Sequence, residues 1–355
     1  MCYSFLHTME KKNTIVLIPS YQPEEILVLL SKSLFELGFK VVVVDDGGGE
    51  TYKHIFSQCE AYADVVVHEV NRGKGAALKT GFKYIIEKYP DYENVITADG
   101  DGQHRIQDII LMYEKGMGKN KPIIGERKFD VKVPLKSKVG NGLSKFTQAL
   151  CTYRYMQDNQ CGLRLFPVSL LPKLIKIRGN RYEYEMRVLT YLQTKEIRYL
   201  LMPVQTIYEE GNKSSHFRPL KDTLLIQSSI LLYGLVNVLS FLVGLTAAIL
   251  FSLFLFKDSP LRYEISILLA SPISLIFHLL INAICFKPRP FVRMMIRLIL
   301  YEIIILSTVL ITVTLFSRVI HLPFVVSYLL TYPLMMFPFY YLIKGVSLVY
   351  NSQNE

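Results

Sequence analysis

The sequence NVITADGDGQH, residues 94–104, decides both the fold and the chemistry expected of this chain. A short apolar run leads into two carboxylates, Asp99 and Asp101, which flank one glycine, and the amide Gln103 follows. Alternate side chains of an extended chain point the same way, so these three are predicted to converge where a buried strand ends. Their oxygen atoms suit Mg²⁺ or Mn²⁺ better than Zn²⁺, and such an ion usually binds a substrate's phosphates. The alternative is an acidic turn that begins the next helix.

Apolar runs on both sides of this motif alternate with helical patterns. The predicted strands are residues 14–18, 41–44, 64–68 and 94–98, and the predicted helices are about 24–37, 51–60, 74–88 and 106–115. Runs of β-branched residues bounded by turn signals indicate strands that are buried on both faces. Their alternation with helices predicts a parallel sheet, in which ligands bind beyond the carboxyl ends of the strands.

Polar or glycine-rich segments follow each of the four predicted strands. They contain Pro19 and Tyr21, then Asp45 and Asp46 before three glycines, then Asn71, Gly73, Lys74 and Gly75, and finally Asp99 and Asp101. Asp46 is expected to accept hydrogen bonds from a base or a ribose, and Tyr21 to stack on a base. Lys74 opens a helix and should favour anionic groups. Arg127 follows another short apolar run and is a candidate for bidentate contact with a phosphate.

Six motifs together show a family resemblance. They are IPSYQPEE (18–25), VVVVDDGGGE (41–50), NRGKGAALKTGF (71–82), TADGDGQH (97–104), GER (125–127) and DNQCGLRLF (158–166). Over residues 13–218 the chain resembles family 2 glycosyltransferases, most closely the polyprenyl-phosphate branch of the dolichol-phosphate mannose synthase type. The resemblance implies a GT-A (Rossmann-like) α/β domain, a nucleotide-diphosphate sugar donor and inversion at the anomeric carbon.

The resemblance also implies roles for individual residues. The nucleotide-sugar would be held by Pro19, Tyr21, Glu25, Val44, Asp46, Lys74, Ala98, Asp99 and Gly100. A Mg²⁺ or Mn²⁺ cofactor would lie on Asp99, Asp101 and Gln103, and the catalytic residues would be Asp101, Arg127 and Asp158. The family's usual Tyr-Asn-Glu reads Tyr-Gln-Pro here, so either Glu24 or Glu25 is left as the contact to the nucleotide.

The acceptor side of the site is expected in the less regular sequence after residue 127. The acceptor phosphate would contact Arg127, Arg164, Lys213, Ser214, Ser215 and Arg218, the last four in a basic loop at 207–222. Asp158 is the candidate general base. The alternative is that no base is used: a lipid phosphate is already an anion near neutral pH, and positioning and charge neutralisation would then suffice. Glu185 is expected on a solvated helix face.

Long apolar segments dominate the second half and predict an all-α membrane domain of four spans. The spans are about 231–256, 263–286, 292–316 and 324–349, each long enough to cross a bilayer. Basic residues concentrate before the first span and between the second and third, which predicts a cytoplasmic first domain and cytoplasmic termini. The region resembles the GtrA-like four-helix family, whose members are thought to help move lipid-linked sugars across membranes.

Composition limits the remaining possibilities. The 355-residue chain is 51% hydrophobic with a net charge of +10, but no nucleic-acid motif accompanies that charge. Its five cysteines have no metal-ligand spacing and are expected to be reduced. The polar N-terminus does not resemble a signal peptide. We therefore expect an integral protein of the cell membrane, the inner membrane if the source is bacterial, with membrane lipids as surroundings and with a homo-oligomer left open.

The predicted activity is transfer of a sugar from a nucleotide-sugar to polyprenyl phosphate, undecaprenyl phosphate in a bacterium, with flipping of the product as an optional further step. The cytoplasmic enzyme domain would span residues 1–220 and the membrane domain 221–355. Two alternatives remain. One is a transferase that acts on a lipid-linked saccharide or polysaccharide, and the other is a lipid-sugar flippase whose first domain only senses nucleotide-sugar.

Overall fold

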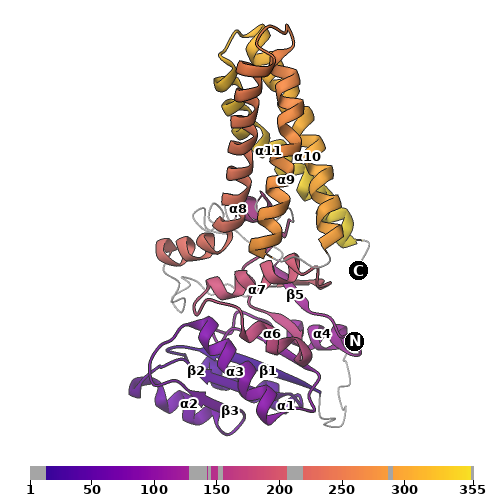
Figure 1. Ribbon diagram of the computed structural model, residues 1–355. Helices are drawn as coiled ribbons and strands as arrows, with labels where there is room; N and C mark the ends of the chain where they lie inside the picture. Colours follow the sequence, from indigo (N-terminus) through magenta and orange to yellow (C-terminus); the bar gives the residue numbers. More distant parts are fainter. Residues whose placement is uncertain are drawn as a thin grey trace.

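The chain folds into an α/β domain followed by a bundle of long helices (Figure 1). This computed structural model describes residues 13–127, 142, 145–150, 155–205, 219–286 and 291–352. The domain is built on one mixed sheet in the order β3-β2-β1-β4-β6-β5-β7. Its strands are β1 (Thr14–Ser20), β2 (Lys40–Asp45), β3 (Asp64–Val67), β4 (Asn94–Thr97), β5 (Ile123–Arg127), β6 (Arg164–Pro167) and β7 (Leu200–Val204).

The strand β1 lies in the middle of the sheet, and every one of its residues is buried. Its side chains alternate between two apolar cores: Val16 and Ile18 belong to one, and Ile15 and Leu17 to the other. This is the arrangement expected of a strand covered on both faces, because successive side chains point to opposite sides. The first four strands are parallel, as predicted, whereas β6 is antiparallel to both β4 and β5.

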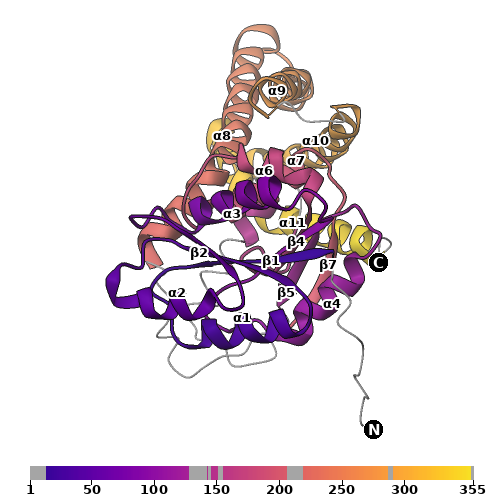
Figure 2. The same ribbon diagram turned by 90° about the horizontal axis from the view of Figure 1, so that it is seen from below.

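Helices cover both faces of the sheet (Figure 2). One face is covered by α1 (Ile26–Glu36), α2 (Lys53–Cys59) and α4 (Ile106–Gly116). The other is covered by α3 (Lys74–Lys88), α6 (Leu171–Ile175) and α7 (Glu183–Thr194). Short 3₁₀ turns, η1 (Glu50–Tyr52) and η2 (Val168–Leu170), precede α2 and α6. The predicted helices up to residue 116 agree with these bounds to within about two residues, because each begins beside a turn signal.

The second half forms four long helices, each of them apolar enough to cross a membrane. They are α8 (Pro219–Leu250), α9 (Arg262–Phe286), α10 (Phe291–Thr314) and α11 (Phe324–Ser352). The π-helical turns η3 (Phe251–Leu255) and η4 (Leu315–Val319) extend α8 and α10. The candidate spans are Gly234–Leu255, Arg262–Cys285, Ile299–Val319 and Phe324–Gly345, which overlap the four predicted segments.

A segment of the α/β domain packs directly against this bundle. Residues 145–150 are helical, and Ala149 and Tyr155 share a buried cluster with Tyr301 of α10 and Ile343 of α11. The side-chain amide of Asn237 on α8 donates a hydrogen bond to the carbonyl oxygen of Leu150 at 3.1 Å. In addition, α7 lies between the sheet and the bundle (Figure 1). The C-terminal end of α11 is therefore held beside the α/β domain.

The core under α3 gives a direct test of this packing. Phe82 is fully buried and meets Phe166 edge to face, with ring centroids 6.2 Å apart. We predict that Phe82→Ala lowers the free energy of unfolding of the α/β domain by about 3–5 kcal/mol, because it leaves a cavity. The matched control Phe35→Ala changes a ring on α1 that is 47% exposed. It should cost less than about 1 kcal/mol in urea titrations of the detergent-solubilised chain. Equal losses in the two variants would contradict the assigned core.

Candidate active site

The carboxyl ends of β1, β2 and β4 meet at one edge of the sheet. The main-chain N–H of Asp46 donates to the carbonyl of Ser20 at 2.8 Å, and that of Ala98 donates to Leu17 at 3.0 Å. A Cβ on Gly100 would approach the Ser20 hydroxyl to 3.0 Å, so the loop after β4 lies close against the end of β1. The sequence-predicted convergence of these loops is therefore present in the fold.

An acidic cluster occupies this edge, with one lysine at its centre. The ammonium nitrogen of Lys74 lies 2.7 Å from a carboxylate oxygen of Asp99 and 2.9 Å from one of Glu185 on α7. The other oxygen of Asp99 lies 3.3 Å from Nε2 of His104. Burial opposes the charge on Lys74, but the two carboxylates outweigh it and raise the lysine pKa. Burial likewise disfavours ionised Asp99, yet Lys74 and His104 hold the pKa of Asp99 well below its usual range.

Asp101 has a different environment from Asp99. One of its oxygens accepts a hydrogen bond of 3.0 Å from the main-chain N–H of Gln103. Burial, followed by the negative charge of Asp99, raises the pKa of Asp101. Behind Asp99, a Cβ on Gly162 would come within 2.6 Å of its carboxylate, so the motif at 158–166 must pass here without a side chain. A further cation beside Asp101 would relieve the repulsion between the two aspartates.

The chemistry of this cluster fits a divalent cation. Three carboxylates, Asp99, Asp101 and Glu185, face one lysine, so the negative charges exceed the lysine's positive charge by two (three minus one). The donors are carboxylate oxygen atoms, which suit Mg²⁺ or Mn²⁺. Within the described residues, no three His, Cys, Asp or Glu side chains form a preassembled metal site.

Asp46 holds a loop in this structure. The residue is 2% exposed, and its carboxylate accepts hydrogen bonds from the main-chain N–H groups of Arg72 (2.9 Å) and Gly73 (2.7 Å). Nδ1 of His68 lies 2.8 Å from the same carboxylate. This arrangement differs from the expected hydrogen bonds to a base or a ribose, because the oxygens already fix the start of α3. Asp45 is similarly engaged, by the N–H of Gly48 at 2.7 Å.

The other residues assigned to the nucleotide-sugar line the same edge. Pro19 and Val44 are buried and paired in register between β1 and β2. Tyr21 is partly exposed just beyond β1, and Ala98 is 1% exposed. Glu25 is exposed at the start of α1, where one of its carboxylate oxygens lies 3.7 Å from Nε2 of His54. Lys74 departs most from its expected role, since its ammonium group is already committed to two carboxylates.

Arg127 and Asp158 form a bidentate ion pair. Nε and Nη2 of Arg127 lie 2.5 and 3.0 Å from the two carboxylate oxygens, and the main-chain N–H groups of Arg127 and Gln160 also donate to them. Burial disfavours the carboxylate's charge, but Arg127 holds the pKa of Asp158 below its usual value. Such a carboxylate is a weak proton acceptor, so the expectation of a general base at Asp158 meets an unfavourable environment.

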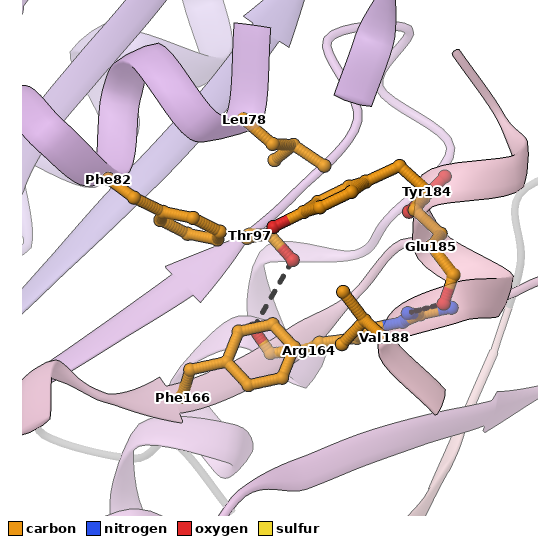
Figure 3. Close-up of a pocket in the computed structure, with 8 residues that line it drawn as sticks. All are labelled: Leu78, Phe82, Thr97, Arg164, Phe166, Tyr184, Glu185 and Val188. Carbon is orange, nitrogen blue, oxygen red and sulfur yellow. Dashed lines mark hydrogen bonds between the residues drawn. The ribbon is translucent and has the colours of Figure 1, made fainter. Parts of the chain in front are cut away.

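Arg164 lies inside the protein instead of on the acceptor surface expected for it. It is 1% exposed and lines a small, largely apolar cavity with Thr97, Tyr184 and Glu185 (Figure 3). Its guanidinium donates to the carbonyl oxygens of Cys161 at 2.9 Å and Glu185 at 2.8 Å. Because β6 places Arg164 next to Thr97 of β4, this side chain braces the acidic cluster from behind. The other expected acceptor contacts, Lys213, Ser214, Ser215 and Arg218, lie outside the described residues.

Glu185 is the functional candidate that the sequence analysis missed. It was expected on a solvated helix face, but it is only 9% exposed and pairs with Lys74. The expectation was wrong because α7 packs against α3, which the local sequence pattern does not reveal. The buried pair of His68 with Asp46 was not anticipated either. In the sequence, the only indications of the Lys74–Glu185 pair were a lysine at the start of one predicted helix and a glutamate in the first turn of another.

Comparisons with known proteins identify the family. The model of the family described as "Glycosyl transferase family 2" matches residues 15–174. An uncharacterised protein of Methanocaldococcus jannaschii is 30% identical over 59% of this chain and 88% of its own length. The chain belongs to glycosyltransferase family 2. Within that family, it is 30% identical to the UDP-N-acetylglucosamine–dolichyl-phosphate N-acetylglucosaminyltransferase of Methanococcus voltae, over 57% of this chain and 88% of that one. The dolichyl-phosphate β-glucosyltransferase of Saccharomyces cerevisiae is 24% identical over 61% of this chain and 75% of its own.

Among solved structures, the family 2 domain is similar to glucosyl-3-phosphoglycerate synthase of Mycobacterium tuberculosis in complex with Mn²⁺, UDP and glucosyl-3-phosphoglycerate. The TM-score is 0.44 at 13% identity, over 66% of this chain and 85% of that one. The acidic cluster described above lies within the segment that the family model matches, except for Glu185.

The loop-holding arrangement of Asp46 predicts a stability effect in the absence of any ligand. Asp46→Ala should destabilise the α/β domain by about 1–3 kcal/mol for each buried main-chain N–H left without an acceptor. Glu69→Ala, an exposed change in the same loop, is the matched control and should be close to neutral. Thermal unfolding without nucleotide measures both. A ligand-free Asp46→Ala variant as stable as the Glu69→Ala variant would contradict this role.

The ion pair between Arg127 and Asp158 predicts a double-mutant cycle. Arg127→Gln should cost about 3–5 kcal/mol near pH 7, because it leaves the buried Asp158 charge unpaired. Adding Asp158→Asn should recover part of that loss. Since Asp158 has a lowered folded-state pKa, the pair's contribution is present above about pH 4 and is lost as pH falls through the folded value. Additive losses in the two single variants, measured by urea titration, would contradict the pairing.

Proposed function

We propose that this family 2 glycosyltransferase moves a sugar from a nucleotide-diphosphate sugar to a polyprenyl phosphate at a membrane surface. The observation that carries the proposal is the acidic cluster of Asp99, Asp101 and Glu185, which is balanced by a single lysine at the ligand-binding edge of the sheet. The names of two relatives, both dolichyl-phosphate sugar transferases, support a lipid phosphate as the acceptor. The four apolar helices support a location at a membrane.

A divalent cation, Mg²⁺ or Mn²⁺, is proposed as the cofactor. Asp101 and Gln103 would hold it, together with whichever oxygen of Asp99 is released by Lys74 or His104. When bound, such a cation would neutralise the diphosphate of the departing nucleotide. The remaining nucleotide contacts are proposed along Pro19, Tyr21, Glu25, Val44, Asp46, Ala98 and Gly100, with the loop that Asp46 holds forming one wall.

The transfer step needs no protein base in this proposal. An oxygen of the lipid phosphate, already ionised near neutral pH, attacks the anomeric carbon while the bond from that carbon to the nucleoside diphosphate breaks, so the configuration inverts. The low pKa of Asp158 agrees with this, because its carboxylate is a poor proton acceptor. The protein then contributes positioning and charge compensation. In this proposal, the ion pair with Asp158 holds the Arg127 side chain in place on the acceptor side.

The membrane arrangement extends the same proposal. The family 2 domain would occupy residues 1–220 on the cytoplasmic side, with both termini, and a GtrA-like domain would occupy residues 221–355. Of the expected acceptor loop at 207–222, residues 219–222 begin α8 instead, and residues 207–218 lie outside the described residues. Basic residues of that segment are proposed to contribute to binding of the acceptor, which would be undecaprenyl phosphate if the source is a bacterium. Flipping of the product by the four helices is an optional second step. The alternatives of a lipid-linked saccharide acceptor, or of a flippase that only senses nucleotide-sugar, are outcomes of the experiment below.

Asp101 gives the sharpest test of the catalytic proposal. Asp101→Asn should lower transfer at least about 100-fold, because it weakens binding of the cation that would compensate the negative charge of the leaving group. The assay follows radiolabelled sugar into an organic-extractable, mild-acid-labile lipid, with UDP-glucose, UDP-N-acetylglucosamine and GDP-mannose each tried as donor. Asp91→Asn, an exposed aspartate before β4, is the matched control and should keep full activity.

Removal of divalent cations should have the same effect on the wild-type chain. Chelation with EDTA should stop transfer, and Mg²⁺ or Mn²⁺ should restore it, while the thermal midpoint of the protein without nucleotide stays within a few degrees. Full activity of Asp101→Asn, or of the chelated wild type, would remove the cation from the mechanism. Label that appears in a polymer, or no label in lipid with any donor, would favour one of the two alternatives.

A further inference from the structure

Cations gather where the family 2 domain meets the helical bundle. Lys145, on the helical segment 145–150, interacts electrostatically with two other cations. They are Arg127 at the end of β5 and Lys344 on α11. Two carboxylates, Glu126 and Asp158, share this junction. Among the residues that the structure describes here, three positive charges therefore face two negative ones, an excess of one positive charge. The net charge of this group is positive, whereas that of the cluster around Asp99 and Asp101 is negative, so we treat the two as separate sites.

The position of Lys344 is fixed by aromatic packing. Its ammonium group lies 5.4 Å from the ring centroid of Tyr155. Tyr340, one helical turn earlier on α11, packs against Tyr155 and Phe146, with ring centroids 5.9 and 5.2 Å apart. Ile343 is fully buried in the same cluster. The last of the four long helices thus brings a lysine to the family 2 domain, next to the end of its candidate membrane span, Phe324–Gly345.

The same segment is connected to the residues beside Asp158. The amide oxygen of Gln148 accepts a hydrogen bond of 2.7 Å from Asn159, and its amide nitrogen lies 3.3 Å from an oxygen of Gln193 on α7. Asn159 directly follows Asp158, whose two oxygens are bound to Arg127. A displacement of the segment would therefore reach the ion pair.

The negative groups compensate the cations only in part. Asp158 is committed to Arg127 through both of its oxygens. Burial, and to a smaller extent the charge of Asp158, raise the pKa of Glu126. Burial lowers the pKa of Lys145, and the positive charges of Arg127 and Lys344 lower it further. The carboxylates of Asp158 and Glu126 act in the opposite direction. Bringing like charges together costs free energy, and an anion between them would recover it.

We propose that Lys344 and Lys145 together hold the phosphate of the acceptor lipid, so that the last membrane helix supplies part of the catalytic site. This inference rests on the proposed function, since a phosphate monoester at a membrane surface is the acceptor named there. Lysine binds phosphate as a point charge, and a lysine near the end of a membrane helix extends toward the headgroup level. Lys344 is a binding residue in this account, and the ring of Tyr155 positions it.

The experiment compares Lys344→Gln, Lys344→Arg and the control Lys257→Gln, an exposed lysine at the opposite end of the bundle. Transfer from the active donor to undecaprenyl phosphate is measured in detergent at varied concentrations of each substrate. Lys344→Gln should raise the KM for undecaprenyl phosphate about tenfold or more and leave the donor KM within about twofold, a loss of about 1.4 kcal/mol in acceptor binding. Lys344→Arg should restore most of the affinity, and Lys257→Gln should match the wild type. An unchanged acceptor KM in Lys344→Gln would overturn the proposal.

A second readout does not depend on catalysis. Undecaprenyl phosphate should raise the thermal midpoint of the wild type more than undecaprenol, UDP or phosphatidylglycerol does, and Lys344→Gln should lose that difference. Lys145→Gln, which should show the same loss, replaces Lys344→Gln if the latter does not fold. Equal stabilisation by phosphatidylglycerol would show that Lys344 is only a headgroup anchor and would overturn the proposal. Wild-type stabilisation that depends on Lys344, without any transfer to lipid, would instead support the lysine site and overturn the proposed function.

Discussion

The ion pair of Lys74 with Asp99 and Glu185 is the interaction on which the site depends. It joins the loop after β4 to the starts of α3 and α7, three segments that are far apart in the sequence. Without the lysine, the buried carboxylate of Glu185 and the partly exposed carboxylate of Asp99 would lose the positive charge that they share, which is unfavourable for both. With it, the pKa of Asp99 is held below its usual range, whereas burial and, after it, the negative charge of Asp99 raise the pKa of Asp101. The cluster is thus both a structural link and an incomplete charge balance, and the missing charge is what a divalent cation with a diphosphate would supply.

A second electrostatic region, of opposite sign, lies on the side of the domain that faces the bundle. The pair of Arg127 with Asp158, the helical segment 145–150 and the end of α11 meet there. In the proposed reaction, a cation bound by the acidic region would face the departing nucleotide diphosphate, and the basic region would face the incoming lipid phosphate. If Lys344 binds the acceptor phosphate as proposed, the membrane helices do more than anchor the enzyme. The packing of Tyr340 against Tyr155 and Phe146 would then fix the position of Lys344.

Much of the fold could be predicted from local patterns. The apolar runs of β1 and β4 and the turn residues around them located the first four strands, and hydropathy located the four long helices. The antiparallel direction of β6 could not be predicted, because strand periodicity carries no direction. At the site, the position of Asp99 and Asp101 followed from the strand before them. The partners of Asp99, Asp46 and Asp158 did not, because each depends on a segment brought close only by tertiary packing, as with Glu185 and Lys74. Arg164 was expected to contact the acceptor phosphate, and its burial was not foreseen, since only the sheet order shows that β6 is interior.

The most direct measurement of the central claim is Mn²⁺ binding to the full chain in detergent, followed by electron paramagnetic resonance in the presence of UDP or GDP. The account predicts that the wild type binds Mn²⁺ together with a nucleoside diphosphate, and that Asp101→Asn loses this binding while Asp91→Asn keeps it. Retention of bound Mn²⁺ and nucleotide by Asp101→Asn, at the wild-type affinity, would contradict the assignment of the acidic cluster as the donor site.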